Sequence, residues 1–291
     1  DLYYAPTPNG WKISIMLEEC KLPYKLISMN LGKGDQFKPE FLEISPNNRM
    51  PALVDTENGL SIFESGAILV YLAEKTGKFL PQDTLGRFNV LQWLFWQVGG
   101  LGPMAGQLGH FRNYAPGGKT NHEYAHTRYA QEYDRLFAVM ERRLGSNEYL
   151  ADDYSIADIA SWCWIVVYKG FEQPMDAYPG LRRWFDTVKQ RPALRKAMEM
   201  GKVHTSVSKV ILAAAVIDDV LGIIVLGVVT AMSVVGVAGQ AHTVGIGDVF
   251  LIFLRMVAFF IVFWFLGRKF LAKCCAKMRQ LPASQAQLAF V

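Results

Sequence analysis

Apolar and polar positions follow two different periods along the first 80 residues. Short apolar runs that end at Pro, Gly or Asn are typical of strands, and stretches with apolar positions three and four residues apart are typical of helices. Six residues separate the first strand from the first helix, and four of them are Pro, Thr or Asn. The predicted elements are strands at 2–4, 24–30, 52–55 and 60–63 and helices at 11–20, 37–42 and 65–75.

The order of these elements, β-α-β-α-β-β-α, predicts an α/β thioredoxin-like domain over residues 1–80. From residue 86 to 201 the pattern has helical period throughout, which predicts an all-α domain. Its clearest local signal is Ser155-Ile156-Ala157-Asp158, a capping box at the start of an apolar helix. We interpret that motif as structural.

Residues 202–291 differ from the rest in both hydropathy and charge. Two apolar runs, 207–230 and 246–266, are each long enough to span a bilayer, which predicts a transmembrane α-helical hairpin. This region carries eight Lys or Arg against three Asp, whereas residues 1–201 carry 22 basic and 23 acidic residues. Basic residues follow the second run and are absent between the runs, so the positive-inside rule predicts that both ends face the cytoplasm.

The charge balance of residues 1–201 gives no electrostatic footprint for nucleic acid. The four cysteines have neither a disulfide nor a zinc spacing, and the start of the sequence carries no secretory pattern. We therefore expect no metal site and a cytoplasmic body, anchored through residues 202–291 to the cytoplasmic side of the inner membrane.

Five motifs in residues 1–200 resemble the nu-class glutathione transferases, a group that includes bacterial disulfide-bond reductases and is similar to the folded part of the yeast nitrogen-regulation prion. The resemblance implies a thioredoxin-like glutathione-binding domain, an all-α transferase domain, bound glutathione as substrate or cosubstrate, and a homodimer. The motifs are Tyr4-Ala5-Pro6-Thr7-Pro8-Asn9-Gly10, the loop through Gln36, Ser45-Pro46-Asn47-Asn48-Arg49-Met50-Pro51, Phe63-Glu64-Ser65-Gly66, and 92–104.

Glutathione presents two carboxylates, an ammonium and a thiol, and two of the motifs suit its charged end. At Glu64-Ser65 a strand gives way to a helix, whose free N–H groups bind a carboxylate while Glu64 meets the ammonium. A plain helix cap is the alternative. Met50-Pro51 stands where thioredoxin-like folds carry a cis-proline, which leaves the Met50 backbone to pair with the peptide. An ordinary turn is the alternative there.

The thiol end is predicted at the start of the first helix. No cysteine stands there, and Cys20 is expected to be a buried small hydrophobe. By resemblance, Thr7 and Asn9 are the catalytic residues that hydrogen-bond the glutathione sulfur and favour its thiolate. Tyr3 and Tyr4 are alternative donors, although packing is the expected role of a tyrosine in a strand.

Other polar residues complete the predicted glutathione site. Gln36, Asn48 and Arg49 are candidates for contact with the peptide. Arg128 matches an arginine that, in the resembling proteins, reaches glutathione from the partner subunit, and a solvated helix charge is the alternative.

The resemblance implies that two glutathione molecules occupy one site and supply both sulfurs for reduction of a small disulfide. The same thiolate would also serve transfer to electrophilic substrates or peroxide reduction, and the sequence leaves these activities open. A non-catalytic glutathione-binding regulatory module is a further alternative.

A second resemblance concerns residues 207–222, which look like the paired-aspartate helix of the second cation/proton antiporter family. It implies that Asp219 is an ion ligand, with Asp218 beside it, in part of a Na⁺(K⁺)/H⁺ antiporter. Such transporters are built from about a dozen spans, and two spans cannot form that site. A membrane anchor is therefore the expected role of residues 202–291.

Overall fold

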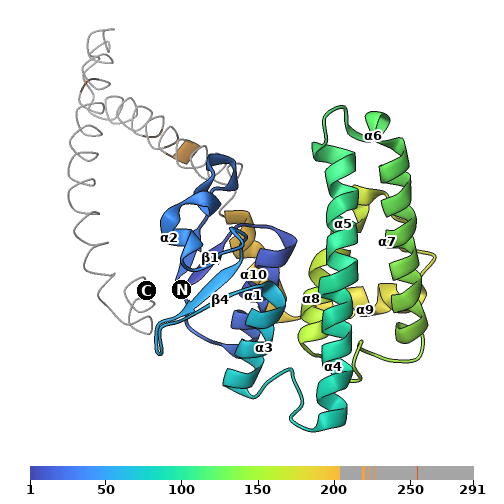
Figure 1. Cartoon of the computed structure of the whole chain (residues 1–291), viewed down its shortest axis with the longest axis horizontal. Coiled ribbons are helices and arrows are strands. Elements are labelled where there is room, and N and C mark those ends of the chain that lie inside the picture. Colours follow the sequence, from blue (N-terminus) through green and yellow to red (C-terminus); the bar gives the residue numbers. More distant parts are fainter. Residues whose placement is uncertain (204–217, 220–221, 223–225, 227–253, 255–291) are drawn as a thin grey trace, which may run out of the picture. The chain divides into compact units, whose positions relative to one another are not determined.

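The structure is a computed structural model, and Figure 1 shows its course. It describes residues 1–203, 218–219, 222, 226 and 254, of which residues 1–203 lie within one compact unit, Asp1–Thr205.

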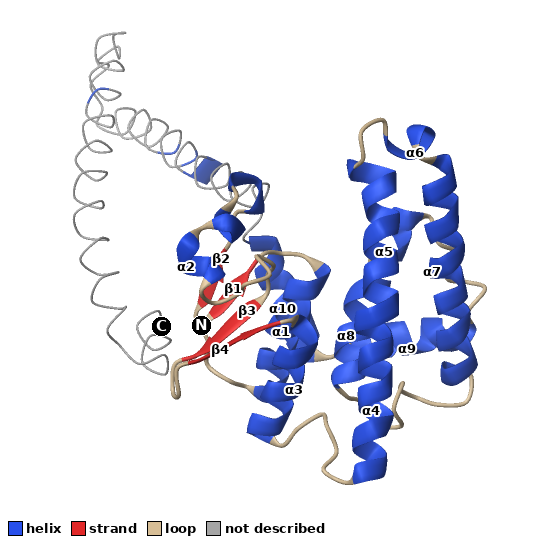
Figure 2. Ribbon diagram, viewed as in Figure 1, coloured by secondary structure: helices blue, strands red, loops and turns tan. Residues whose placement is uncertain are grey.

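A four-stranded sheet forms the centre of the first domain. Its strand order is β2-β1-β3-β4, with β1 parallel to β2 and the other pairs antiparallel. Figure 2 shows the sheet in red, with α1 and α3 on the side of the helical domain. The strands are β1 (Leu2–Tyr4), β2 (Leu26–Ser28), β3 (Ala52–Asp55) and β4 (Leu60–Phe63). The predicted order of elements is confirmed, and only the strand expected at 24–30 is much shorter.

The helices of this domain cover both faces of the sheet. On one face, α1 packs against α3 through a shared apolar core that includes Ile13 and Ile68. On the other face, Phe41 packs against Met29 and Ala52. The helical elements are α1 (Pro8–Cys20), η1 (Leu31–Lys33), η2 (Asp35–Phe37), α2 (Pro39–Leu42) and α3 (Ser65–Thr76).

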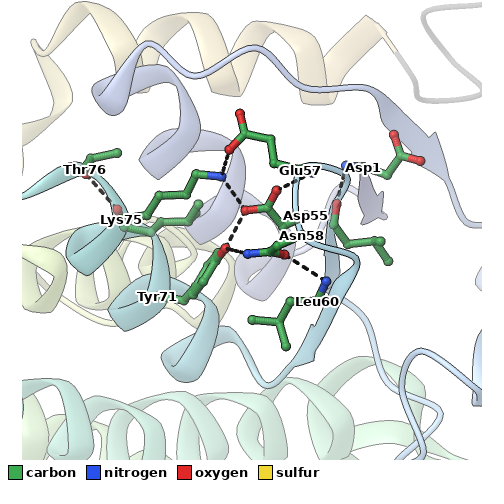
Figure 3. Close-up of polar contacts among 10 residues, drawn as sticks. Asp1, Asp55, Glu57, Asn58, Leu60, Tyr71, Lys75 and Thr76 are labelled. Atoms are coloured by element: carbon green, nitrogen blue, oxygen red, sulfur yellow. Dashed lines mark hydrogen bonds and ion pairs between the residues drawn. The ribbon is translucent and has the colours of Figure 1, made fainter.

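A polar cluster ties the β3–β4 hairpin to α3 (Figure 3). Lys75 Nζ contacts Asp55 and lies 2.6 Å from Glu57 Oε2. The Tyr71 hydroxyl donates to Asp55 and accepts from Asn58 Nδ2 at 3.2 Å. Hydrogen bonds from Lys75 and Tyr71 lower the pKa of Asp55 to about 2. The cluster fixes the strand that leads directly into the start of α3.

The second domain is helical, as the pattern of residues 86–201 predicts. Its helix α8 packs on both α1 and α3, and α10 packs on α1. The elements are α4 (Thr84–Trp96), η3 (Gln97–Leu101), α5 (Gly102–Gly109), η4 (His110–Tyr114), α6 (Gly118–Asn121), α7 (Glu123–Leu144), α8 (Ile156–Ile165), η5 (Tyr168–Phe171), α9 (Pro179–Lys189) and α10 (Pro192–Val203).

The predicted capping box begins α8. Asp158 Oδ2 accepts from Ser155 N at 3.0 Å, while the Ser155 hydroxyl accepts from Ala157 N at 3.3 Å. The other carboxylate oxygen accepts from Leu150 N at 3.1 Å and from Trp184 Nε1 at 2.8 Å. The Ser155 hydroxyl also donates to Asp158 Oδ2, at 3.2 Å. Asp158 is fully buried, and burial raises its pKa to about 6 despite these four donors. The motif thus fixes α8 against the neighbouring segments, as a structural role requires.

The predicted membrane hairpin falls almost wholly outside the described residues. Within the described part of the chain, no helix is long and apolar enough to cross a membrane. Asp218 and Asp219 are described, and both are helical and exposed. The domain boundaries 1–80, 86–201 and 202–291 stay predictions.

Candidate functional site

A cavity of about 600 Å³ opens beside the start of α1 and is bounded by α3, η3, α5 and the end of α8. It gathers residues that are far apart in the sequence. Nine of the residues predicted to bind glutathione or its sulfur line it: Thr7, Asn9, Gln36, Asn48, Arg49, Met50, Pro51, Glu64 and Ser65.

The first turn of α1 forms one end of the cavity. Thr7 caps the helix, and its hydroxyl accepts from Gly10 N at 3.4 Å. Pro8 occupies the first helical position, where a backbone N–H would have no partner in the helix and its absence costs nothing. The helix therefore begins three residues earlier than its apolar spacing predicts. A Cβ on Gly10 would stand 2.2 Å from Ala5 O, so only glycine allows this close turn.

Neutral hydrogen-bonding groups face this end. Asn9 Oδ1 accepts from Trp164 Nε1 at 3.0 Å, and within the described residues its Nδ2 has no protein acceptor. The Thr7 hydroxyl lies 4.0 Å from the thioether sulfur of Met50. Donors at a helix N-terminus stabilise a thiolate over a thiol, so the geometry suits the predicted sulfur position.

The Met50–Pro51 peptide bond is cis, as the sequence predicts. Met50 precedes β3 and lies outside its strand register. Its sulfur accepts from Ala5 N at 3.1 Å, so the side chain links the loop before α1 to the loop before β3.

The opposite end is the start of α3. Glu64 has φ of 71° and ψ of 118°, in the left-handed range that a residue with a side chain rarely adopts. Its side chain makes no cap hydrogen bond, and Ser65 begins the helix. Backbone strain of this kind concentrates at functional sites, where it orients a binding group. The free N–H groups of the first turn suit a carboxylate.

A buried lysine lies behind that helix start. Lys12 is 2 % exposed, and its ammonium donates to Ser65 Oγ at 3.2 Å and to Gln97 Oε1 at 2.7 Å. Within the described residues no carboxylate lies within ion-pair distance of it. Burial lowers the pKa of Lys12 to about 8, while Cys163 and Glu64 oppose that shift. The cavity therefore has a basic group at the end where the sequence predicts a carboxylate of glutathione.

Three loop residues complete the wall. Gln36 Oε1 is buried without a hydrogen-bond partner in the described structure, which leaves an acceptor for a ligand N–H. Asn48 adopts φ of 45° and donates its N–H to Ser45 O at 2.9 Å. Arg49 is exposed, and its carbonyl accepts from the Ser45 hydroxyl at 2.8 Å.

Neither described cysteine borders the cavity. Cys20 and Cys163 are both buried, which confirms the structural role expected for Cys20. Burial raises the pKa of both thiols, that of Cys163 to about 12. Tyr4 is 1 % exposed and packs in the core, and burial raises its pKa to about 12. No thiolate from the described chain is therefore available at the sulfur position.

Arg128 and the paired aspartates lie elsewhere. Arg128 stands on α7, exposed, with its Nη1 3.8 Å from Glu132 Oε2. Its contact with glutathione across a subunit interface stays a prediction. Asp218 and Asp219 lie outside the compact unit that holds the cavity, and ion binding by them stays a prediction.

Several residues of the cavity wall were not predicted as site residues from the sequence, and three of them form hydrogen bonds at its two ends. Lys12, Gln97 and Trp164 line the cavity, each from an otherwise apolar helical stretch. A lysine inside the apolar period of residues 11–20 was the available signal for Lys12. Gln97 and Trp164 are brought close by tertiary packing alone.

Two family models match the chain. Residues 1–74 match the glutathione S-transferase N-terminal domain, and residues 123–187 match the glutathione S-transferase C-terminal domain.

Known proteins match the same part of the chain. Disulfide-bond oxidoreductase YfcG of Escherichia coli is 52 % identical over 204 residues, a match covering 68 % of this chain and 94 % of that protein. Disulfide-bond oxidoreductase YghU of the same organism is 41 % identical over 219 residues, covering 70 % and 75 %.

Solved structures match as well. A glutathione transferase from Burkholderia graminis with two glutathione molecules bound per subunit has a TM-score of 0.65 at 44 % identity, covering 68 % of this chain and 86 % of that one. One from Pseudomonas putida with a glutathione disulfide bound per subunit has a TM-score of 0.63 at 40 % identity, covering 68 % and 89 %.

Proposed function

This chain belongs to the glutathione transferase family, and from that premise we propose that it is a glutathione-dependent disulfide-bond oxidoreductase. The single observation that carries the proposal is the composition of the cavity's thiol end. Thr7 and Asn9 stand there at a helix N-terminus, and no described cysteine borders the cavity. The reacting sulfur is therefore that of bound glutathione.

Two glutathione molecules supply the electrons. The thiolate of the first attacks one sulfur of a disulfide substrate, forms a mixed disulfide and releases the other sulfur as a thiol after it gains a proton. The thiolate of the second glutathione attacks the glutathione sulfur of that mixed disulfide. Glutathione disulfide forms and the second substrate thiol leaves. A related structure with two bound glutathione molecules corresponds to the start of this reaction, and one with a bound glutathione disulfide corresponds to its end.

The charged end of the cavity orients the peptide. Glu64 meets the glutathione ammonium, while Ser65 and the first turn of α3 hold its carboxylate. Gln36, Asn48 and Arg49 contact the remainder of the peptide. The Met50 backbone beside Pro51 pairs with it as an added strand would.

A homodimer completes the site in this proposal. Large apolar side chains are exposed along α4, including Phe88 at 63 % and Phe95 at 70 %. A face of this kind suits burial against a second copy of the chain. Arg128 of the second copy then reaches the glutathione of the first.

A disulfide assay tests the proposal. The full chain, supplied with glutathione and hydroxyethyl disulfide, is expected to form glutathione disulfide at the rate at which substrate disulfide is consumed. Binding of glutathione without turnover would overturn the proposal in favour of a non-catalytic regulatory module. Turnover of a halogenated aromatic or a peroxide, but of no disulfide, would assign the thiolate to transferase or peroxidase chemistry.

For residues 202–291 we propose a membrane anchor, supported by the two apolar runs and the basic residues after the second. The transferase domains then stand on the cytoplasmic side. Sedimentation of the full chain with membranes, with release after truncation at 201, is the expected result. Cation–proton exchange in vesicles that is lost on Asp219→Ala would instead support the antiporter alternative.

A further inference from the structure

One hydrogen bond joins the two domains at the thiol end of the cavity. Trp164, near the end of α8, donates its indole N–H to Asn9 Oδ1 at 3.0 Å, across 155 residues of sequence. Both residues line the cavity. The bond therefore reaches from the helical domain to the residue predicted to contact the sulfur.

The chemistry of the two groups fixes the direction of the Asn9 amide. An indole nitrogen can only donate, so the atom of Asn9 that faces it must be the carbonyl oxygen. The amide N–H₂ group then points away from Trp164. A rotated amide would present its oxygen to the ligand and leave two donors facing each other.

Trp164 is itself held in place. Its carbonyl accepts from the buried Tyr133 hydroxyl at 2.8 Å. Its ring fits against two glycines of α5: a Cβ would stand 3.2 Å from Nε1 if added to Gly102, and 3.4 Å from Cη2 if added to Gly106. The capping box at Asp158 fixes the start of the same helix. The donor is thus rigid, while the Asn9 side chain could otherwise turn.

We propose that Trp164 is a positioning residue, whose indole N–H sets the Asn9 amide so that Nδ2 donates to the sulfur of bound glutathione. This inference rests on the proposed function. The helical domain then decides whether the Asn9 amide turns its N–H₂ group or its oxygen toward the thiol, although Asn9 itself belongs to the first domain.

A double-mutant cycle tests the inference, with wild type, Trp164→Phe, Asn9→Ala and the double variant compared as full chains. The readouts are the pKa of the bound glutathione thiol, followed by thiolate absorbance against pH, and kcat and KM for disulfide reduction. Trp164→Phe is expected to raise the thiol pKa by about one unit and lower kcat about tenfold, with KM for glutathione within about twofold. In the Asn9→Ala background, Trp164→Phe is expected to change neither the thiol pKa nor kcat.

Three results would overturn the inference. The first is an unchanged thiol pKa in Trp164→Phe, and the second is a tenfold loss that persists in the double variant. The third is a rise in KM alone, which would assign the ring to a wall of the substrate site. If wild type binds glutathione but shows no turnover, the proposed function is wrong instead. The inference about Trp164 can still be tested in that case, because the thiol pKa is measured without turnover.

Two further proteins separate the N–H from the ring. Replacement of Trp164 by 3-benzothienylalanine keeps two fused rings but exchanges the N–H for sulfur, and it should reproduce the effect of Trp164→Phe even if that variant folds poorly. Trp162→Phe is the matched control on the same helix. The Trp162 indole donates to Phe185 O at 3.1 Å, away from Asn9. Its loss should lower stability and leave the pKa of bound glutathione unchanged.

Discussion

The two ends of the cavity present different chemical groups to the glutathione that we propose it binds. At the thiol end, Thr7 and Asn9 are neutral, and Asn9 is oriented by Trp164. At the carboxylate end, α3 begins beside Lys12, a buried ammonium without a carboxylate partner among the described residues. The difference follows from what each end must do. A carboxylate stays ionised and needs only to be bound, whereas a thiolate must form and remain reactive.

Nucleophilicity explains why neutral donors suit the thiol end. A thiolate becomes a weaker nucleophile as its pKa falls, and the best attacking thiol has a pKa near the ambient pH. A full positive charge against the sulfur would stabilise the thiolate strongly and slow its attack. Oriented dipoles lower the thiol pKa more moderately. We therefore expect substitutions at the thiol end to change kcat and substitutions at the carboxylate end to change KM.

The largest effect is expected for Asn9→Ala. Removal of one hydrogen-bond donor to a reacting anion lowers kcat by about 100-fold in comparable sites. Glutathione should keep its contacts at the other end of the cavity, so its KM should change little. Steady-state kinetics with varied glutathione measure this split. A rise in KM with unchanged kcat would show that Asn9 binds the peptide rather than the sulfur, and would remove the contrast between the ends.

The next largest effect is expected for Lys12→Met, which keeps the length of the side chain and removes its charge. Charge-assisted bonds contribute about 1.5–3 kcal/mol, so KM for glutathione should rise about tenfold or more. The kcat should stay within about threefold. Lys21→Met, on the exposed end of α1, is the matched control and should leave both constants unchanged.

The pH dependence of stability tests whether Lys12 is buried as a charged group, which distinguishes the carboxylate end from the neutral thiol end. Lys12 has a pKa of about 8 in the folded chain against the ordinary 10.5, so the unfolded chain binds more protons between these values. Stability should therefore rise with pH from about 8 to 10.5. Between pH 8 and 10.5, the free energy of unfolding should rise by on the order of 1–3 kcal/mol more in wild type than in Lys12→Met. Denaturant titrations of both proteins measure the difference, and parallel curves would contradict it.

The smallest effect is expected for Arg128→Ala. The side chain is exposed and acts on glutathione only across the proposed dimer interface, so KM should rise about two- to threefold. In a Phe95→Asp variant, which places a charge on the exposed face of α4, the chain should be monomeric and the effect of Arg128→Ala should vanish. Sedimentation and kinetics on the single and double variants test both statements.

Sequence patterns predicted the fold of residues 1–203 closely because its signals are local. Strands at 52–55 and 60–63, the capping box at Ser155 and the thioredoxin order depend on short apolar runs and turn residues. The start of α1 was misplaced because Thr7 and Pro8 specify it by capping rather than by apolar period.

The site was only partly predictable for a physical reason. Loop motifs at helix starts predicted Thr7, Asn9, Glu64 and Ser65 as site residues, and all four line the cavity. Trp164 carries no local signal, and the apolar period around Lys12 marks that lysine without indicating its role. Their contacts span 155 and 53 residues of sequence. Contacts of that range are set by packing of the domains, which apolar periodicity does not specify.

The proposed mechanism makes bound glutathione the source of the reactive sulfur, at a thiol end built from neutral donors. It is tested most directly by titrating the thiolate absorbance of glutathione bound to a full-chain variant in which Cys20, Cys163, Cys274 and Cys275 are all replaced by Ala. All thiolate signal then comes from glutathione. A pKa at least about one unit below the ordinary thiol value of about 8.5 is the predicted result. An unshifted pKa in a variant that binds glutathione would contradict the account.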